Sequence, residues 1–377
     1  MKRQLLGVAA ILLSISTYAQ DNPLWMRYCA ISPDGTTIAF TYKGDIYTVP
    51  STGGRASQIT TNPAHDTKPI WSPDGKKIAF ASDRMGSMDI FEVNKEGGIP
   101  KRLTTHSGNE TPVAYKDAGH ILFLANIMPT AEDAQFPSGQ FQQVYEVNTE
   151  GGRPVLFSSM PMEDISINHT GNTLLYHDKK GYEDPWRKHH TSSITRDIWL
   201  CSLNGNRTFR KQTAFNGEDR TPVWASDDKS FYYLSEEKGS FNIFKRDIDG
   251  NTSKQITNHT KHPVRFLSAA SNGTLCYGYD GEIYTVKEGA IPQKVQISIV
   301  TDKNDKDLIR QIKRSGATEI SLSPDAKEIA FVLRGDVYVT STEYSTTKQI
   351  TNTPQQERDI HFSPDGRSIV YAAERNG

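Results

Sequence analysis

Cysteine, net charge and long apolar stretches are all scarce in this 377-residue chain, and each scarcity excludes a class of protein. Three cysteines allow at most one disulfide, which excludes a disulfide scaffold and favours buried apolar roles for Cys29, Cys201 and Cys276. A formal net charge of −1 argues against a nucleic-acid partner, because nucleic-acid binders carry a basic excess. The longest apolar run, residues 5–15, is too short to cross a bilayer, so we expect no membrane span.

The common signatures of catalysis are missing as well. The chain contains no Gly-x-Ser-x-Gly, His-Glu-x-x-His, Cys-x-x-Cys, Walker or Gly-x-Gly-x-x-Gly motif, so we predict no catalytic residue, no metal site and no cofactor. His189 and His190 are the best metal candidates, but adjacent histidines on extended chain diverge and their spacing matches no common zinc site. A solvated basic loop accounts for this cluster; the alternative is that Arg187 binds a carboxylate or phosphate.

The apolar run at the start of the chain has the form of a secretory signal peptide. Lys2 and Arg3 precede it, and residues 17–19 (TYA) place small residues at positions −3 and −1 of a cut before Gln20. A buried N-terminal strand or helix is the alternative. We therefore expect residues 1–19 to be removed and the mature protein to be exported, soluble and periplasmic.

One ten-residue pattern recurs along the chain. Residues 31–40 (ISPDGTTIAF) return almost unchanged as residues 71–80, 322–331 and 362–371. Degenerate copies bring the total to eight, and the turn positions lie 40 to 57 residues apart; these copies occupy residues 115–123, 167–176, 224–233 and 267–277. Repeats of this period indicate an array of similar supersecondary units.

Each repeat predicts four antiparallel strands. In Ser-Pro-Asp-Gly, Pro suits position i+1 of a type I turn and Gly suits i+3, and the Asp should cap its own turn. The flanking residues alternate apolar and polar, as half-buried strands do. A third strand follows (Asp45-Ile46-Tyr47 in the first copy), and a Gly-Gly turn leads into a fourth (Gln58-Ile59-Thr60). Four strands per unit indicate an all-β fold, the β-propeller, in which tryptophans such as Trp71, Trp199 and Trp224 pack between blades.

The repeat spacing also predicts a division into domains. Residues 301–316 are dense in charge and interrupt the strand pattern, so we interpret them as a linker. Residues 24–300 then form a six-bladed propeller, and residues 317–377 form the first one and a half blades of a second propeller in a truncated polypeptide. Because residues 24–34 supply the innermost strand of blade 1, every blade should be contiguous, without the usual overlap of first and last blades. The alternative is a long loop within one seven- or eight-bladed ring.

These repeats resemble the propellers of TolB and of tricorn-type serine proteases. The Ser-Pro-Asp-Gly anchor followed by Asp-Ile-Tyr carries the resemblance, and inserts around residues 129–143 and 182–197 resemble those of exported bacterial tricorn homologues. The resemblance implies a parent peptidase in which two propellers serve substrate access and product exit for a core with a PDZ-like module and a serine nucleophile. No position of this chain matches that core, so the chain alone should be inactive. Two alternative interpretations stay open: a stand-alone TolB-like binding propeller, and the propeller of a prolyl-oligopeptidase-type hydrolase.

The lengths and charges of the loops predict which face of the propeller carries its function. The Ser-Pro-Asp-Gly and Gly-Gly turns lie on one face, so both long inserts, from blades 3 and 4, rise on the other. The loops between blades on that face carry charged residues where the innermost strands begin. We predict that these residues surround the mouth of the central channel, with Arg187 in an insert above it, and that they bind peptides or dock other domains: Asp66, Lys68, Glu110, Glu163, Asp164, Glu218, Arg220 and Lys261. The alternative is that the inserts cover blade edges and the charges are solvated.

Overall fold

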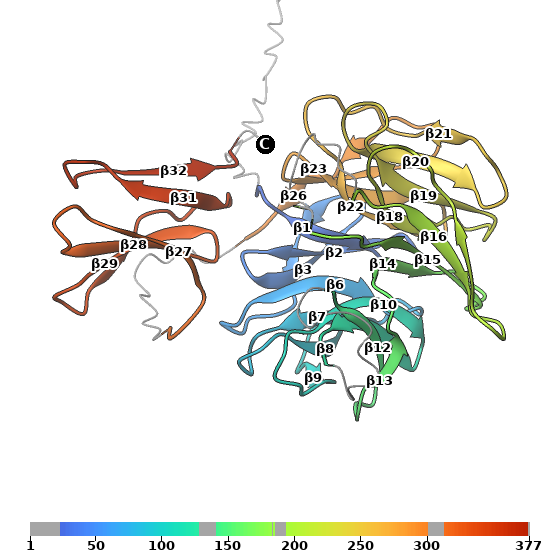
Figure 1. The fold of residues 1–377 in the computed structure, drawn as a ribbon, viewed down its shortest axis with the longest axis horizontal. Coiled ribbons are helices and arrows are strands. Elements are labelled where there is room, and N and C mark those ends of the chain that lie inside the picture. Colours follow the sequence, from blue (N-terminus) through green and yellow to red (C-terminus); the bar gives the residue numbers. More distant parts are fainter. Residues whose placement is uncertain (1–22, 128–140, 183, 185–193, 301–312, 376–377) are drawn as a thin grey trace, which may run out of the picture.

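The computed structural model describes residues 23–127, 141–182, 184, 194–300 and 313–375, and every regular element in them is a β-strand (Figure 1). Six four-stranded antiparallel sheets come first, each built from contiguous sequence. The first strands of neighbouring sheets contact one another in a closed cycle, from β1 through β6, β10, β14, β18 and β22 back to β1. This cycle is the wall of a central channel, and the predicted fold class, an all-β propeller, is confirmed.

Each blade runs from the channel outward through four strands. Blades 1 to 3 consist of β1 (Arg27–Ile31), β2 (Thr37–Tyr42), β3 (Asp45–Pro50) and β5 (Ser57–Gln58); β6 (Asp66–Trp71), β7 (Lys77–Ser82), β8 (Asp89–Asn94) and β9 (Lys101–Arg102); and β10 (Thr111–Asp117), β11 (His120–Ala125), β12 (Gln143–Asn148) and β13 (Val155–Ser158). Blades 4 to 6 consist of β14 (Met162–Ile167), β15 (Thr173–Asp178), β16 (Ile198–Ser202) and β17 (Thr208–Lys211); β18 (Asp219–Trp224), β19 (Ser230–Ser235), β20 (Asn242–Asp247) and β21 (Ser253–Gln255); and β22 (Arg265–Ala269), β23 (Leu275–Tyr279), β24 (Glu282–Val286) and β25 (Gln293–Lys294).

The repeated anchor forms the turn between the first two strands, and its aspartate caps that turn as predicted. In blade 1 the Asp34 carboxylate accepts hydrogen bonds from the Ser32 hydroxyl (2.6 Å) and the Thr36 backbone N–H (3.0 Å). These bonds hold the pKa of Asp34 below its usual value. Gly35 takes a left-handed conformation (φ 77°), which explains the glycine at this position.

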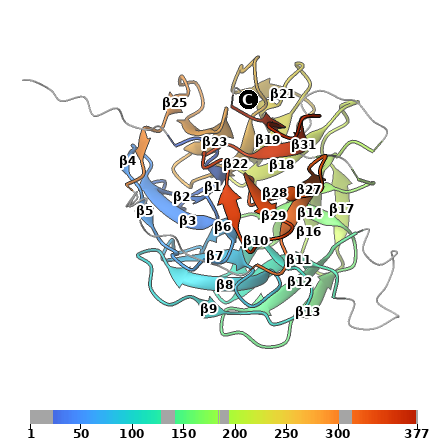
Figure 2. The same cartoon turned by 90° about the vertical axis from the view of Figure 1, so that its left-hand side faces the viewer.

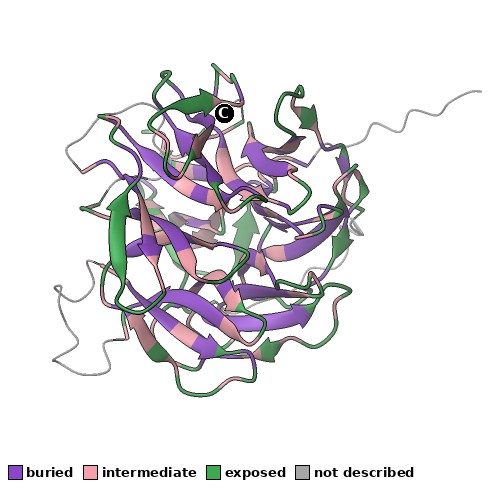
Figure 3. Cartoon of the chain, turned by 90° about the vertical axis from the view of Figure 1, so that its right-hand side faces the viewer, coloured by how far each residue is buried: buried purple, intermediate pink, exposed green. Residues whose placement is uncertain are grey.

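Aromatic and aliphatic side chains of the middle strands pack between blades, and the buried segments in Figure 3 follow these strands. Phe40 of β2 stacks on Tyr47 of β3 with ring centroids 5.8 Å apart, and the same pair recurs in other blades. Trp71 of blade 2 donates a hydrogen bond from its indole N–H to the Ala30 carbonyl of blade 1 (2.8 Å), and Trp224 does the same to Ser166 of blade 4 (3.0 Å). The three cysteines are buried and free.

Blade 6 is joined to blade 1, and here the expected lack of any overlap is wrong. A short strand that follows blade 6, β26 (Ile297–Ser298), pairs in parallel with β4 (Gly54–Arg55) at the outer end of blade 1. Gly53 allows this crossing, because a Cβ there would lie 2.7 Å from the Gln296 carbonyl oxygen. The chain therefore closes its ring with a strand added across blade 1 instead of a strand supplied to blade 6.

Residues 317–373 form two further sheets, which pair with none of the other described strands. One sheet is β27 (Ala317–Leu322), β28 (Glu328–Leu333), β29 (Asp336–Ser341) and β30 (Thr347–Gln349), and the other is β31 (Glu357–Phe362) with β32 (Ile369–Ala373). They pack on each other through Ala330, Val332, Val337 and Ile360. We call residues 317–374 the second unit; Figure 2 looks at the ring with this unit in front of it.

Candidate functional site: the mouth of the channel

Two sets of loops lie at the same end of the channel, which we call the mouth. They are the loops between the second and third strands of a blade and the loops that lead into the next blade. The Gly44 carbonyl, at the tip of the first kind of loop, accepts a hydrogen bond from the Asp66 N–H, where β6 begins (2.7 Å). The Met88 carbonyl accepts the corresponding hydrogen bond from the Glu110 N–H in the next blade (2.7 Å). The residues at the start of each innermost strand are therefore positioned by the preceding blade.

Each innermost strand contains a bulge close to the mouth, and in five of the six blades one residue of the bulge has a left-handed backbone. These residues lie four positions before the first residue of the anchor turn, with φ between 48° and 57°: Tyr28, Lys68, Asp164, Thr221 and Phe266. Blade 3 has Pro112 at this position, and its ring prevents a positive φ. A left-handed backbone is unfavourable for non-glycine residues, so the surrounding blades must hold it in place.

The left-handed residues of adjacent blades touch one another. The rings of Tyr28 and Phe266 lie 4.9 Å apart, and the Lys68 ammonium lies 5.7 Å from the Tyr28 ring. On the other side, the Thr221 hydroxyl donates a hydrogen bond to the Asp164 carboxylate (2.6 Å). The mouth therefore has an aromatic and cationic side, from blades 6, 1 and 2, and a hydroxyl and carboxylate side, from blades 4 and 5.

Arginines precede the left-handed residue in three consecutive blades: Arg220, Arg265 and Arg27, from blades 5, 6 and 1. Burial, together with the neighbouring Arg220 and Arg27, lowers the pKa of Arg265 to about 10. Burial also lowers the pKa of Arg27. Arg27 and Arg265 line a pocket of about 220 Å³ whose walls include Trp25, Phe266 and Tyr279. Asp280 and Glu374 also line this pocket, so its walls combine aromatic rings with charges of both signs.

A network of opposite charges lies beneath the mouth in blades 4 and 5. The Glu163 carboxylate contacts Lys179 Nζ (2.6 Å) and His177 Nε2 (3.3 Å). Burial opposes its ionisation, but the hydrogen bonds and charges of these two partners outweigh burial and hold the pKa of Glu163 well below its usual value. Arg196, at the end of the second insert, pairs with the buried Glu218 (2.8 Å).

Other carboxyl groups at the blade junctions are buried with fewer opposite charges. Asp66 is bound by Arg84 through both of its oxygens (2.9 Å each). By contrast, burial raises the pKa of Glu110, and separately that of Asp219, to about 7. Burial and the neighbouring Asp66 raise the pKa of Asp45 to about 7 as well. With pKa values of about 7, Glu110, Asp219 and Asp45 are partly protonated at neutral pH.

The charged residues predicted from the sequence to surround the mouth lie in different environments in the structure. Lys68 and Asp164 lie among the left-handed residues of the mouth, and Lys261 is exposed on the loop into blade 6. Arg220 is nearly buried beside Glu218 (3.4 Å). Glu163 is half-buried in its network, and the remaining carboxylates are buried at blade junctions: Asp66, Glu110 and Glu218. Arg187 lies outside the described residues, as do His189 and His190.

Sequence reasoning missed the aromatic residues and two arginines of the mouth. It searched for charge in the loops, whereas Tyr28, Phe266, Arg27 and Arg265 belong to the innermost strands. Aligning the repeats on their anchor turns would have placed Tyr28 and Phe266 in the column of Lys68. The useful signal was therefore the position within the repeat.

Two searches of the described residues found nothing further. No group of three or more His, Cys, Asp or Glu side chains there is arranged to hold a metal ion. The same residues include no helix with the length and apolar character that crossing a membrane requires.

Comparison with known proteins gives a consistent result. Residues 23–290 match the tricorn protease N-terminal β-propeller domain. Tricorn protease homolog 1 of Streptomyces coelicolor is 24% identical over 94% of this chain and 32% of its own length. The tricorn protease homolog of Saccharolobus solfataricus is 27% identical over 74% of this chain and 26% of its own length.

The crystal structure of the tricorn protease superposes with a TM-score of 0.62 at 18% identity, covering 91% of this chain and 33% of that one; this likeness concerns the fold alone. The chain thus spans between about a quarter and a third of the length of these relatives. Since the match to the domain extends over most of the chain, the protein belongs to the family of tricorn protease N-terminal β-propeller domains.

Proposed function

We propose that this chain is the N-terminal propeller portion of an exported, tricorn-like serine peptidase, and that its mouth acts in substrate access, product exit or docking of other domains. The family supports the peptidase context. The observation that carries the role of the mouth is the arrangement of left-handed residues around the channel, one in each of five blades, next to a pocket lined by Arg27 and Arg265. Such residues cost stability, and strain of this kind is found where a chain must present side chains in a defined direction.

The chemistry of the mouth suits peptides. Tyr28 and Phe266 offer apolar contacts, and Arg27 and Arg265 can neutralise a carboxylate. Peptides of the parent enzyme are the proposed ligands, and the catalytic and PDZ-like domains are the proposed neighbours. The signal-peptide pattern of residues 1–19, which lie outside the described residues, supports export to the periplasm.

A substitution that narrows the mouth of the channel in the full-length peptidase tests this proposal. Thr221→Tyr places a ring at a position where blade 1 already holds Tyr28 with the same backbone φ, 52°. We expect kcat/KM for long peptides to fall, with little change for a small chromogenic substrate that needs less room. Thr221→Ser, which keeps the hydroxyl bonded to Asp164, is the matched control. Equal turnover of long peptides by Thr221→Tyr and the control would contradict a role of the mouth in peptide passage.

A further inference from the structure

The second unit aligns residue by residue with the start of the ring. Lys43 corresponds to Arg334 and Ser72 to Ser363, a constant offset of 291 positions without insertion or deletion. The loop between the second and third strands reads Lys43-Gly44-Asp45 in blade 1 and Arg334-Gly335-Asp336 in the second unit. Their backbones agree, since φ is 49° and 55° at the basic residues and 86° and 85° at the glycines. We call these two loops the basic tips.

Each basic tip reaches into the other unit. Lys43 Nζ donates a hydrogen bond to Asn352 Oδ1 (3.2 Å), and Arg334 Nη2 donates to the Pro63 carbonyl oxygen. Asn352 and Pro63 belong to corresponding loops, because Pro63 matches Pro354 at the same offset. The contact is therefore reciprocal: the tip of the ring binds the inter-blade loop of the second unit, and the tip of the second unit binds the inter-blade loop of the ring. Reciprocity of this kind is the property of an interface about a two-fold axis.

The charges at this contact are complementary. Burial raises the pKa of Asp45 to about 7 and that of Asp336 to about 6, and the basic tips oppose this rise, Arg334 at Asp45 and Lys43 at Asp336. Arg27 adds a further bond to the second unit, from Nη2 to Gln356 Oε1 (2.6 Å). The Arg334 guanidinium also comes close to Gly44, since a Cβ there would lie in van der Waals contact, 3.5 Å from Nη1.

The turn itself does not require a basic residue. Blade 6 has a loop of the same form, Asp280-Gly281-Glu282, in which Asp280 has φ 53° and Gly281 has φ 75°. An acidic residue therefore fits the same backbone. This tip contacts Trp25 and Met26 of its own ring, and the Gly281 carbonyl accepts a hydrogen bond from the Met26 N–H (3.2 Å). A basic residue occurs in the two tips that meet each other.

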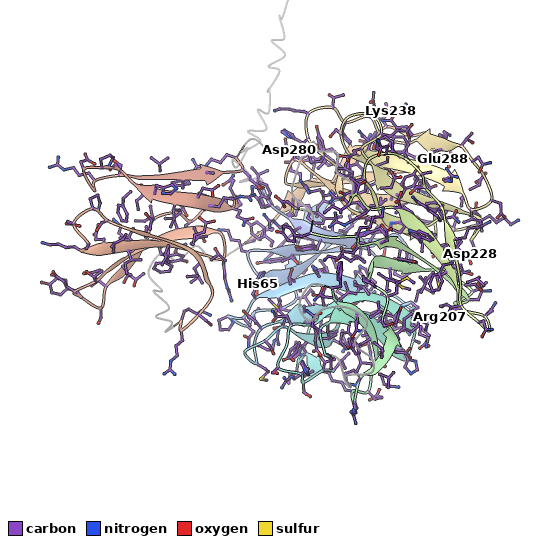
Figure 4. All side chains as sticks on the ribbon, viewed as in Figure 1. His65, Arg207, Asp228, Lys238, Asp280 and Glu288 are labelled. Atoms are coloured by element: carbon purple, nitrogen blue, oxygen red, sulfur yellow. The ribbon has the colours of Figure 1, made fainter. Side chains whose placement is uncertain are left out.

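We infer that the two basic tips and the loops they contact form a pseudo-two-fold docking surface, whose partner is the first blade of the second unit. The surface lies at the mouth on the side of blades 1 and 2, so the second unit is held with its own corresponding loops facing the mouth (Figures 1 and 2). Figure 4 shows His65, in the contacted loop, on the side of the ring nearest the second unit, whereas Asp228 and Glu288 lie on the far side. This inference does not depend on the proposed peptide chemistry.

Charge reversal in the whole chain tests the docking surface. Lys43→Glu with Arg334→Glu brings acidic groups toward Asp336 and Asp45, and both substituted residues are exposed, so the blades should fold normally. We expect small-angle X-ray scattering to report an increase of several ångströms in the radius of gyration, with unchanged circular dichroism. Lys238→Glu with Lys287→Glu, which makes the same charge change elsewhere on the ring, should scatter like the wild type. A double variant of the basic tips that scatters like the wild type would overturn the inference.

A crosslinking experiment gives an independent result. Lys43→Cys with Asn352→Cys should be joined rapidly by a short bis-maleimide, while the three native cysteines are buried. Lys238→Cys with Asn352→Cys is the matched control, and we expect it to stay unjoined at equal reagent concentration. Equal yields for the two pairs would contradict a defined docking surface even if the peptide-passage test succeeded.

Discussion

At the residue scale, the buried carboxyl groups of the blade junctions make stability depend on pH. Asp219 is 1% exposed, and burial raises its pKa from 3.8 to about 7. The folded state therefore binds more protons than the unfolded state between these two values. Stability contributed by the protonated form is complete below pH 3.8, falls as the pH rises through this window, and is fully lost above pH 7.

Asp219→Asn should remove this dependence, because the amide stays neutral and keeps polar contact with Ser235 and Thr213. Relative to the wild type, we expect the variant to gain on the order of 3 kcal/mol between pH 4 and pH 8. Urea unfolding across this range measures the difference. Asp249→Asn, at a side chain that is 81% exposed, serves as the control and should leave the slope unchanged. Parallel pH profiles for Asp219→Asn and the wild type would rule this explanation out.

The residues also show what sequence can predict. The role of Asp34 in its turn followed from its neighbours alone, because the partners of an Asp in such a turn lie within two residues. The nearest partners of Glu163 and Glu218 lie 14 to 22 positions away in other segments of the chain, so only the folded structure shows that they are neutralised. For the same reason, the sequence predicted Asp66, Glu110 and Glu218 at the rim of the channel, whereas the structure buries them at blade junctions.

At the scale of elements, ring closure depends on a two-residue strand. Gly53→Ala should distort the crossing of β26, because its new Cβ would meet the Gln296 carbonyl at 2.7 Å. Gly97→Ala is a matched control: φ is 92° at Gly53 and 90° at Gly97, but the nearest atom at Gly97 lies at 3.7 Å. In both variants the left-handed backbone of the new alanine lowers the free energy of unfolding by about 1 kcal/mol.

We expect Gly53→Ala to lose about 1–2 kcal/mol more than Gly97→Ala in chemical denaturation. Hydrogen exchange at Ser298, in β26, should quicken in Gly53→Ala and stay slow in the control. Equal stability and equal exchange in the two variants would mean that the crossing does not hold the ring. The sequence predicted the strands of each blade from periodicity, but it could not predict β26, because a strand of two residues has no period to detect.

At the scale of the whole molecule, the chain spans about a third of its tricorn relatives, and we expect it to lack their chemistry on its own. Purified residues 20–377 should not hydrolyse peptides above the rate of a buffer control, as measured by mass spectrometry after long incubation. The motif search motivates this expectation, since none of the common nucleophile signatures occurs in the sequence. Turnover that disappears on mutation of a serine within this chain would contradict it.

The strand and turn pattern shared by residues 26–82 and 317–373 has a consequence for how the protein reaches its native state. The copies share anchor turns, core aromatics and similar strand lengths, so each presents a related surface to an unfinished ring. A nascent ring that has lost blade 1 could accept the copy in its place, which would be a kinetic trap of the domain-swapped kind. Synthesis from the N-terminus works against this trap, because the first ring, including β26, is complete before the copy emerges. Refolding from denaturant offers both copies at once, so we expect it to be slower and more prone to aggregation than folding during synthesis.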